Sequence, residues 1–382
     1  MSDSFTEYSR QGWLSRIGDS FKGILFGIIV IPLCLILLWW NEGRAVTTAR
    51  SLAEGAAAVV AVQPDKVDAA NDKKLVHVTG EVKADAKAVD DQFQVSAPAL
   101  KLIRNVEIYQ WVEDKKTEKK QNTGGSEETR TTYTYKKEWV DEPVRSQDFK
   151  QSAGHENTGE LIAESGWFIP AKVTLGAYQM PDSLIERMSG AEKLLLADED
   201  LPESLKERAK VHNGVFYVGK DPAAPQIGDQ RVSYEIVKPG PFSIIAAQIG
   251  ETFGEYQTKA GDALSMIESG VVTAEVMFKN AATANAILTW GLRFVGFLFM
   301  SFGFMAIMRP LSVLGSVLPF LGNLIGMGTG LIAFVLAGVV SLVVIAIAWI
   351  VVRPVLGIAL LVLAVGGLIW MRKMAASKPA QA

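Results

Sequence analysis

Few residues of this 382-residue chain stand at a spacing typical of catalysis or ligand binding. The closest match is the stretch 214–220, Gly-Val-Phe-Tyr-Val-Gly-Lys, which fits the start of a phosphate-binding loop. Such a loop needs Ser or Thr at the next position to hold the metal ion, whereas Asp221 stands there. The bulky residues between the two glycines are typical of a strand, so we predict a strand and no nucleotide site.

The other reactive side chains are scattered. His77, His155 and His212 lie far apart and form no pair at metal-ligand spacing. Cys34 is the single cysteine and lies in an apolar run, where a thiol is a poor nucleophile. We therefore expect no catalytic residue, no cofactor and no metal ion, and a protein that is not an enzyme. The net charge of −3, with no dense basic stripe, gives no support for nucleic-acid binding.

Long apolar runs define the elements that must position any site. No charged residue occurs between Arg309 and Arg353, a composition that a bilayer favours and a soluble fold does not need. We predict transmembrane helices over residues 23–40, 288–308, 331–352 and 354–371. No Asp, Glu, Lys or His lies centrally in these spans, which weakens a transporter interpretation.

The stretch 311–330 is a poor straight helix because it contains Pro319 and several glycines. We expect it to re-enter the membrane or to lie against the helices. With four spans, the segment 1–22 and the basic tail 372–382 share the cytoplasmic side, as the positive-inside tendency prefers. Residues 41–287 then form one non-cytoplasmic domain, periplasmic or lumenal, between spans one and two.

Alternating patterns predict strands in that large segment at residues 75–79, 102–112, 131–140, 215–218 and 231–237. Short helices are predicted at 182–188 and 202–210. The predicted fold class is a multi-pass α-helical membrane protein with four spans and a large extramembrane α+β domain, mainly antiparallel sheet, between spans one and two.

The second and third predicted strands form a hairpin whose connection, 113–130, is polar and expected to be mobile. Its aromatic residues all fall on odd positions and therefore share one face of the hairpin, namely Tyr109, Trp111, Tyr133, Tyr135 and Trp139. Such a face binds a ligand or lipid surface, or more commonly packs on its own domain.

Small residues recur every three or four positions near the start of the third span, at Gly322, Gly326, Gly330, Ala333 and Ala337. This spacing lets helix backbones approach closely. It is consistent with self-association or with packing inside the chain's own bundle.

A polar motif follows the first span at the expected membrane interface and comprises Trp39, Trp40, Asn41, Glu42, Gly43 and Arg44. Tryptophans favour this depth, and the charged residues could meet lipid headgroups or the domain. The alternative interpretation is a connector that orients the domain.

The stretch 41–55, Asn-Glu-Gly-Arg-Ala-Val-Thr-Thr-Ala-Arg-Ser-Leu-Ala-Glu-Gly, resembles the transmembrane protein 43 (LUMA) family. Further similar segments follow in order at 75–80, 106–113, 133–139, 228–233 and 289–293. The resemblance implies four spans and a lumenal or periplasmic loop. It also implies a membrane scaffold of the endoplasmic reticulum or inner nuclear membrane, or of the bacterial inner membrane for a bacterial member.

We therefore predict a non-enzymatic membrane scaffold that self-associates and presents its large domain to partner proteins or lipid headgroups. The expected partners are membrane lipids, further copies of the chain and other membrane proteins. Two alternatives remain open, a channel-like or transport-related component and an envelope enzyme acting on lipids.

Overall fold

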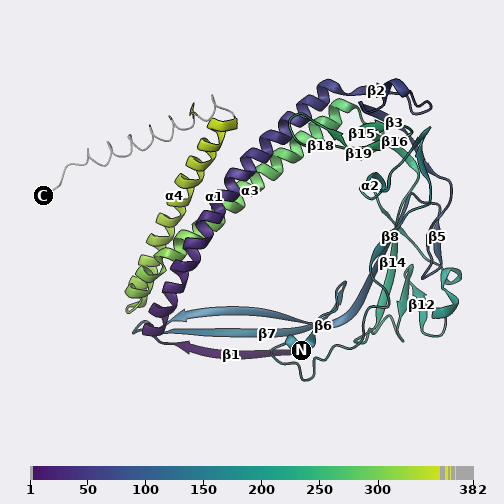
Figure 1. Ribbon diagram of the computed structural model, residues 1–382. Helices are drawn as coiled ribbons and strands as arrows, with labels where there is room; N and C mark the ends of the chain where they lie inside the picture. The colour runs from purple at the N-terminus through teal and green to yellow at the C-terminus, as the bar shows by residue number, and fades with distance from the viewer. Residues whose placement is uncertain (1–2, 353–357, 360–361, 363–365, 367–382) are drawn as a thin grey trace. The chain divides into compact units, whose positions relative to one another are not determined.

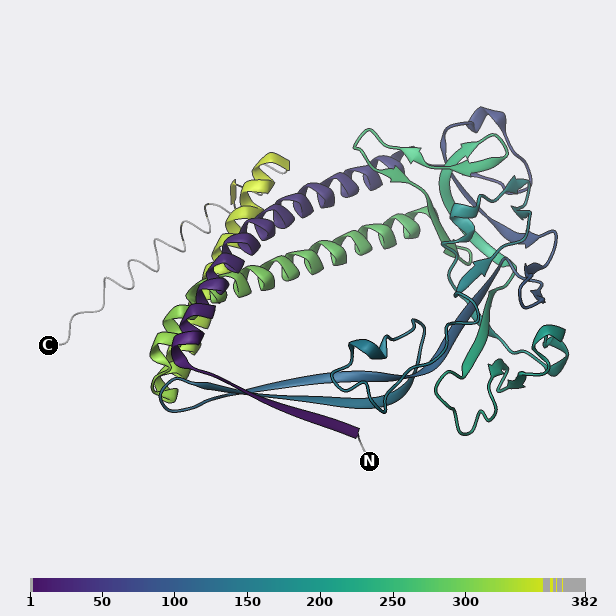
Figure 2. The same cartoon turned by 60° about the horizontal axis from the view of Figure 1, so that its bottom comes forward.

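The computed structural model describes residues 3–352 together with residues 358, 359, 362 and 366. Its elements are shown in Figures 1 and 2. Contacts divide the chain into two units, each described here by itself. The β unit comprises residues 3–6, 51–116 and 131–280, and the helical unit comprises residues 7–50, 117–130 and the described residues after 280.

Three long helices form most of the helical unit: α1 (Trp13–Ala58), α3 (Ala274–Gly315) and α4 (Pro319–Val352). Each is long and apolar enough to cross a membrane. Helices α1 and α3 run side by side in both ribbon views. They approach closely at Gly27, where an added Cβ would lie 2.5 Å from the carbonyl oxygen of Gly303. Their shared core with α4 contains Cys34, Leu38, Met300 and Ala337.

The prediction of four spans with one separate domain between the first two is wrong. The described part of the chain contains three candidate spans, and the stretch 117–130 of the predicted domain belongs to the helical unit. The predicted fourth span, 354–371, lies outside the described residues except for positions 358, 359, 362 and 366. The stretch 311–330 is no separate element, because its residues end α3 and begin α4. Glycine is tolerated in such helices when neighbouring helices pack against it.

Both α1 and α3 continue well beyond their apolar runs. Hydropathy identifies only the apolar part of a helix. Outside that part, packing of α1 against α3 stabilises the helical conformation of both. Beyond the apolar run of α1, for example, the Ala45 carbonyl accepts a hydrogen bond from the Asn285 amide of α3 at 3.0 Å.

Two large sheets make up the strands. The eight-stranded sheet contains β1 (Asp3–Gln11), β6 (Lys101–Gln121), β7 (Glu127–Val140), β8 (Gly166–Phe168), β11 (Glu192–Leu194), β12 (Ala209–His212), β13 (Val215–Val218) and β14 (Gln230–Val237). Its main strand order is β1-β7-β6-β14-β13-β12, with β8 on β6 and β11 on β14.

The seven-stranded sheet contains β2 (Val60–Val62), β3 (Leu75–Ala84), β9 (Val173–Leu175), β10 (Tyr178–Gln179), β15 (Gly240–Ile249), β16 (Thr252–Gly254) and β19 (Met266–Ser269). Its order is β19-β15-β16-β10-β9-β3-β2, and β15 also pairs with β3. Two short hairpins pair β4 (Ala88–Asp90) with β5 (Val95–Ala97) and β17 (Tyr256–Gln257) with β18 (Ala263–Leu264).

Each large sheet has its own hydrophobic core. Tyr178, Leu175 and Ile244 lie in the core on the seven-stranded sheet, and Phe216, Val232 and Leu102 lie in the core on the eight-stranded sheet. The pairings are mainly antiparallel, as predicted, because alternating residues on these strands bury one face. The predicted strands are present, whereas the predicted helices shrink to α2 (Asp182–Ile185) and a 3-10 turn at Glu203–Leu205.

The predicted hairpin is present but much longer than expected. Strand β6 continues to Gln121 and β7 begins at Glu127, so the connection is only residues 122–126. Apolar periodicity did not predict the strand over residues 113–121, because these residues are polar and an exposed strand has no apolar face.

Candidate functional site

The polar motif after the first apolar run meets α3 and α4 in a buried cluster. Glu42 is only 1% exposed, and its two carboxylate oxygens accept bonds from Arg293 at 2.7 and 2.8 Å. The indole nitrogen of Trp349 donates to the same carboxylate. The Arg293 guanidinium also lies 4.6 Å from the ring centre of Trp290 and 5.4 Å from that of Trp349. One carboxylate therefore joins all three helices.

A second set of bonds continues this cluster along α1. The buried amide of Asn41 donates to the carbonyl oxygen of Thr289 at 3.1 Å. Arg44 donates to Asn285 Oδ1 and Thr289 Oγ1, both at 2.9 Å. The Asn285 amide donates in turn to the Ala45 carbonyl at 3.0 Å. We call these side chains the polar clasp: Asn41, Glu42, Arg44, Asn285, Thr289, Arg293 and Trp349.

A hollow of about 360 Å³ lies at the polar clasp. Alanines of α1 and α3 form much of its wall, and Trp290 and Arg293 border it. Because both oxygens of Glu42 and the guanidinium of Arg293 are engaged with each other, neither charge is free to act on a ligand.

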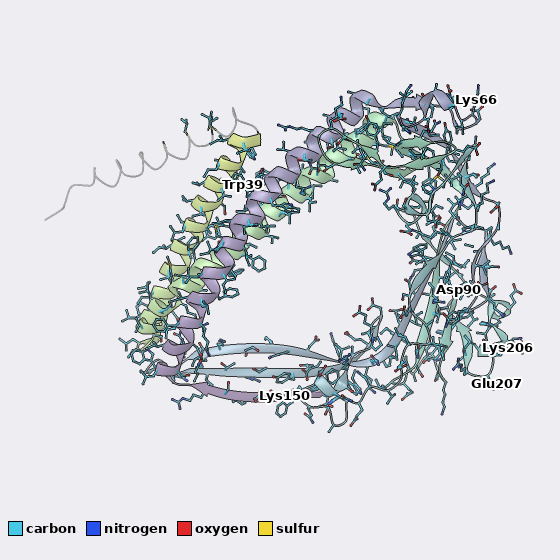
Figure 3. The ribbon with its side chains drawn as sticks, viewed as in Figure 1. Trp39, Lys66, Asp90, Lys150, Lys206 and Glu207 are labelled. Carbon is cyan, nitrogen blue, oxygen red and sulfur yellow. The ribbon has the colours of Figure 1, made fainter. Side chains whose placement is uncertain are left out.

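The sequence predicted only three of the seven residues of the polar clasp. It singled out Asn41, Glu42 and Arg44, but their partners lie about 250 positions away, beyond the reach of local spacing. A usable signal existed, since Glu42 follows the apolar run of α1 and Arg293 precedes that of α3, and these two ends meet when consecutive helices pack antiparallel. Trp39, labelled in Figure 3, and Trp40 are 46% and 56% exposed on α1, and Gly43 has open space around it. Their contact with lipid remains a prediction.

The small residues of α4 face inward. Ala333 and Ala337 are fully buried, and an added Cβ at Gly322 or Gly326 would meet Ser316 at 2.7 Å or Ser312 at 3.0 Å. At Gly330 the nearest atom would be the sulfur of Met305, at 4.0 Å. In the structure these positions pack within the chain. Their part in self-association remains untested.

The five hairpin aromatics contact one another and neighbouring segments of the protein. Tyr109 contacts Trp139 at 5.2 Å between ring centres, and Phe5 of β1 contacts Tyr133 at 6.3 Å. Trp111 and Tyr135 both lie against the buried ring of His155, at 4.8 and 3.9 Å. A role of this face in ligand binding remains a prediction.

Tyr135 belongs to a polar network on that face. Its hydroxyl donates to Glu113 at 2.7 Å and accepts from the Gln151 backbone. Burial, followed by the Glu113 carboxylate, raises the pKa of Tyr135 to about 12. His155 Nε2 lies 2.8 Å from Asp3 and ties the first strand to this network. The tyrosine is therefore held neutral, which suits a structural hydrogen-bond donor better than a general base.

Two further polar clusters lie in the β unit. Asp90, labelled in Figure 3, is fully buried and accepts from Arg104 at 2.7 Å and Tyr234 at 2.6 Å. A hollow of about 400 Å³ on the eight-stranded sheet is bordered by Arg231, which forms a two-bond pair with Glu107. Among the described residues, no three His, Cys, Asp or Glu side chains gather closely enough to hold a metal ion.

Comparisons with known proteins agree with the resemblance noted in the sequence. The family model described as Transmembrane protein 43 matches residues 108–354. Transmembrane protein 43 of Mus musculus is 32% identical over 363 residues, covering 91% of this chain and 89% of the relative. The Homo sapiens protein of that name is 31% identical, covering 91% and 88%. The Drosophila melanogaster homolog is 29% identical, covering 91% and 93%.

No solved structure matches the chain. The matched region of the family model includes β6 from residue 108 onward, all of β7, the Arg293 half of the polar clasp and Trp349. The names of these relatives describe membrane proteins, in agreement with the three candidate spans in the described part of the chain. The protein is a membrane protein, and the chain belongs to the transmembrane protein 43 family.

Proposed function

We propose that this protein is a non-enzymatic membrane scaffold, which self-associates and presents its β unit to partner proteins or lipid headgroups. The polar clasp is the observation that supports this proposal. Two of its oppositely charged side chains, Glu42 and Arg293, form an ion pair and neutralise each other. Together with the bond from Trp349 to Glu42, this pair connects the three helices. A cluster of this kind builds a rigid support, since a buried ion pair tolerates the loss of neither partner.

The helices also carry large exposed apolar side chains. Phe320 and Met327 of α4 are 76% and 75% exposed, and Leu25 of α1 is 63% exposed. Lipid tails or the helices of another copy would cover such side chains. Because the small-residue face is filled from within the chain, we assign self-association to these outer faces.

Disulfide crosslinking in membranes tests this assignment. With Cys34→Ala as background, Met327→Cys and Leu25→Cys place thiols on the outer faces. Ala337→Cys, on the same helix as residue 327 but fully buried, is the matched control. We expect crosslinked dimers from at least one outer position and none from the control. Monomers at both outer positions, at native expression levels, would argue against a self-associating scaffold.

The presentation of the β unit needs its own measurement. Membrane proteins copurified with the wild type should be lost with a variant whose clasp is broken, Glu42→Gln, and kept with Glu203→Gln. Glu203 forms only an exposed ion pair with Lys206 and serves as a matched control. If Glu42→Gln and Glu203→Gln copurify the same partners in equal amounts, recruitment of partners does not depend on the polar clasp.

A further inference from the structure

The hollow of about 360 Å³ at the polar clasp is lined by residues of the helical unit alone. Small side chains of α1 and α3 leave this space open, namely Ala45, Ala49, Ala282 and Ala286. Two of them, Ala282 and Ala286, are exposed, so the hollow is open to the surroundings of the protein. Its volume lies within the range of small-molecule sites in proteins, about 300–1,000 Å³.

Arg293 keeps one unused donor group at this hollow. Its Nε and Nη2 atoms donate to the two carboxylate oxygens of Glu42. The rings of Trp290 and Trp349 lie against the same guanidinium, with their centres 4.6 and 5.4 Å from its carbon. The third nitrogen, Nη1, makes no hydrogen bond to any described residue. Because Arg293 lines the hollow, Nη1 is available to an acceptor that enters it.

The polar clasp also carries one positive charge in excess. Glu42 and Arg293 neutralise each other, whereas Arg44 forms no ion pair with a described carboxylate. Its guanidinium bonds to neutral oxygens of Asn285 and Thr289, both at 2.9 Å, and its buried Nε has no hydrogen-bond partner among the described residues. Asn285 and Thr289 line the hollow, so the charge of Arg44 lies directly behind this wall. An anion in the hollow would balance that charge.

Arg16, near the start of α1, shows how the helical unit balances another buried arginine. Its guanidinium lies 3.4 Å from the Glu127 carboxylate. It also donates to the carbonyl of Gly125, at the tip of the β6–β7 hairpin, at 2.5 Å and to Ser316 Oγ at 3.2 Å. Arg44 lacks such a carboxylate, and the positions outside the described residues contain no Asp or Glu that could supply one. The missing counterion therefore points to a second molecule.

The hollow lies at the depth of lipid headgroups when the apolar runs occupy the core of a bilayer. The run of α1 ends before Glu42, and that of α3 begins after Arg293. Tryptophans, which favour the membrane interface, gather near these ends and the end of α4: Trp39, Trp40, Trp290 and Trp349. Ala45 and Ala49 lie about 5 and 10 Å beyond Glu42 along α1. The headgroup region extends about 5–8 Å beyond the core on each side.

We propose that the hollow at the polar clasp binds the phosphate group of an anionic phospholipid. The phosphate oxygens accept hydrogen bonds from Nη1 of Arg293, and the negative charge balances Arg44. The acyl chains pass Trp290 and follow α3 towards the hydrocarbon, where Phe294 is 61% exposed. A zwitterionic lipid binds less tightly, because its ammonium group is repelled by the net positive clasp. This inference goes beyond the scaffold proposal and needs no second copy of the chain.

Native mass spectrometry of the full chain, purified in a neutral detergent, tests this site. The wild type should bind one dioleoyl phosphatidylglycerol about tenfold more tightly than dioleoyl phosphatidylcholine. Ala286→Leu fills the hollow without removing a bond of the clasp and should weaken phosphatidylglycerol binding about tenfold. Ala284→Leu, also exposed on α3 but outside the hollow, is the matched control and should bind as the wild type does. Arg44→Gln should abolish the preference for the anionic lipid.

Three results would overturn the proposal. Equal binding of the two lipids by the wild type would exclude selection by charge. Phosphatidylglycerol bound as tightly by Ala286→Leu as by the wild type would place the lipid outside the hollow. Glycerol phosphate bound as tightly as the lipid would indicate a site for a soluble phosphate ester. Crosslinking at residues 25 and 327 reports self-association separately, so a failed scaffold and a failed lipid site give different results.

Discussion

Neutralising Glu42 probes the polar clasp most directly. The substitution Glu42→Gln keeps the size of the side chain but removes the charge that balances Arg293. The Glu42 and Arg293 side chains are 1% and 13% exposed, so water cannot replace the lost partner. Removing one partner of a buried ion pair costs about 3–5 kcal/mol. We expect a loss of this size in the free energy of unfolding.

The assay is reversible unfolding in mixed micelles, followed by tryptophan fluorescence, since Trp349 donates to the Glu42 carboxylate. Glu203→Gln is the control, because the Glu203 and Lys206 side chains are 84% and 53% exposed. Such a surface pair contributes about 1 kcal/mol or less.

A double-mutant cycle separates the ion pair from general disruption. Combining Glu42→Gln with Arg293→Gln removes both buried charges, so the two losses should be clearly less than additive, by about 1–3 kcal/mol. Additive losses, or a loss below about 1 kcal/mol for Glu42→Gln alone, would refute the conclusion that this pair fastens the helices.

Three further predictions concern other parts of the protein. Gly125→Ala should undock the hairpin tip and expose it to proteolysis, whereas Gly124→Ala, with similar φ but open space around its Cβ, should have a smaller effect. Gly27→Leu should force α1 away from α3 and lower the thermal midpoint, while Gly43→Ala, with nothing within 4 Å, should leave it nearly unchanged. In a spectrophotometric titration, wild type minus Tyr135→Phe should show one phenol with a pKa of about 12. Because this pKa is raised in the folded state, its stabilising contribution is complete below pH 10 and falls as the pH rises towards 12.

The sequence predicted the strands of the β unit better than the extent of its helices. Residues 231–236 alternate between half-buried and buried positions, and this alternation is visible in the residue types. The charged stretch 113–121 shows no such pattern, because both of its faces are exposed along most of the strand. Tertiary contacts at the tip, through Arg16 and Ser316, hold it in place, and no local pattern reveals such contacts.

The error in the fold class has a related cause. Hydropathy located the apolar parts of α1, α3 and α4 but treated the polar segment between them as one body on one side. The hairpin tip belongs instead with the helices, through a contact between residues about 190 positions apart in sequence. Likewise, the polar residues after Trp40 were recognised as a motif, while their role became clear only beside Arg293 and Trp349.

The contacts of the hairpin tip, residues 124 and 125, with Arg16 and Val317 set an order for the biogenesis of the protein. Arg16 and Ser316 are separated by 300 residues, and the hairpin that docks between them is synthesised long before the turn at 316–318 that follows α3. In a nascent chain the polar hairpin therefore lacks the residues that it contacts until α3 has left the ribosome. Insertion factors or chaperones that shield such a segment would act in that interval. A chain that stops before residue 313 would lack the residues that the hairpin tip contacts at the end of α3.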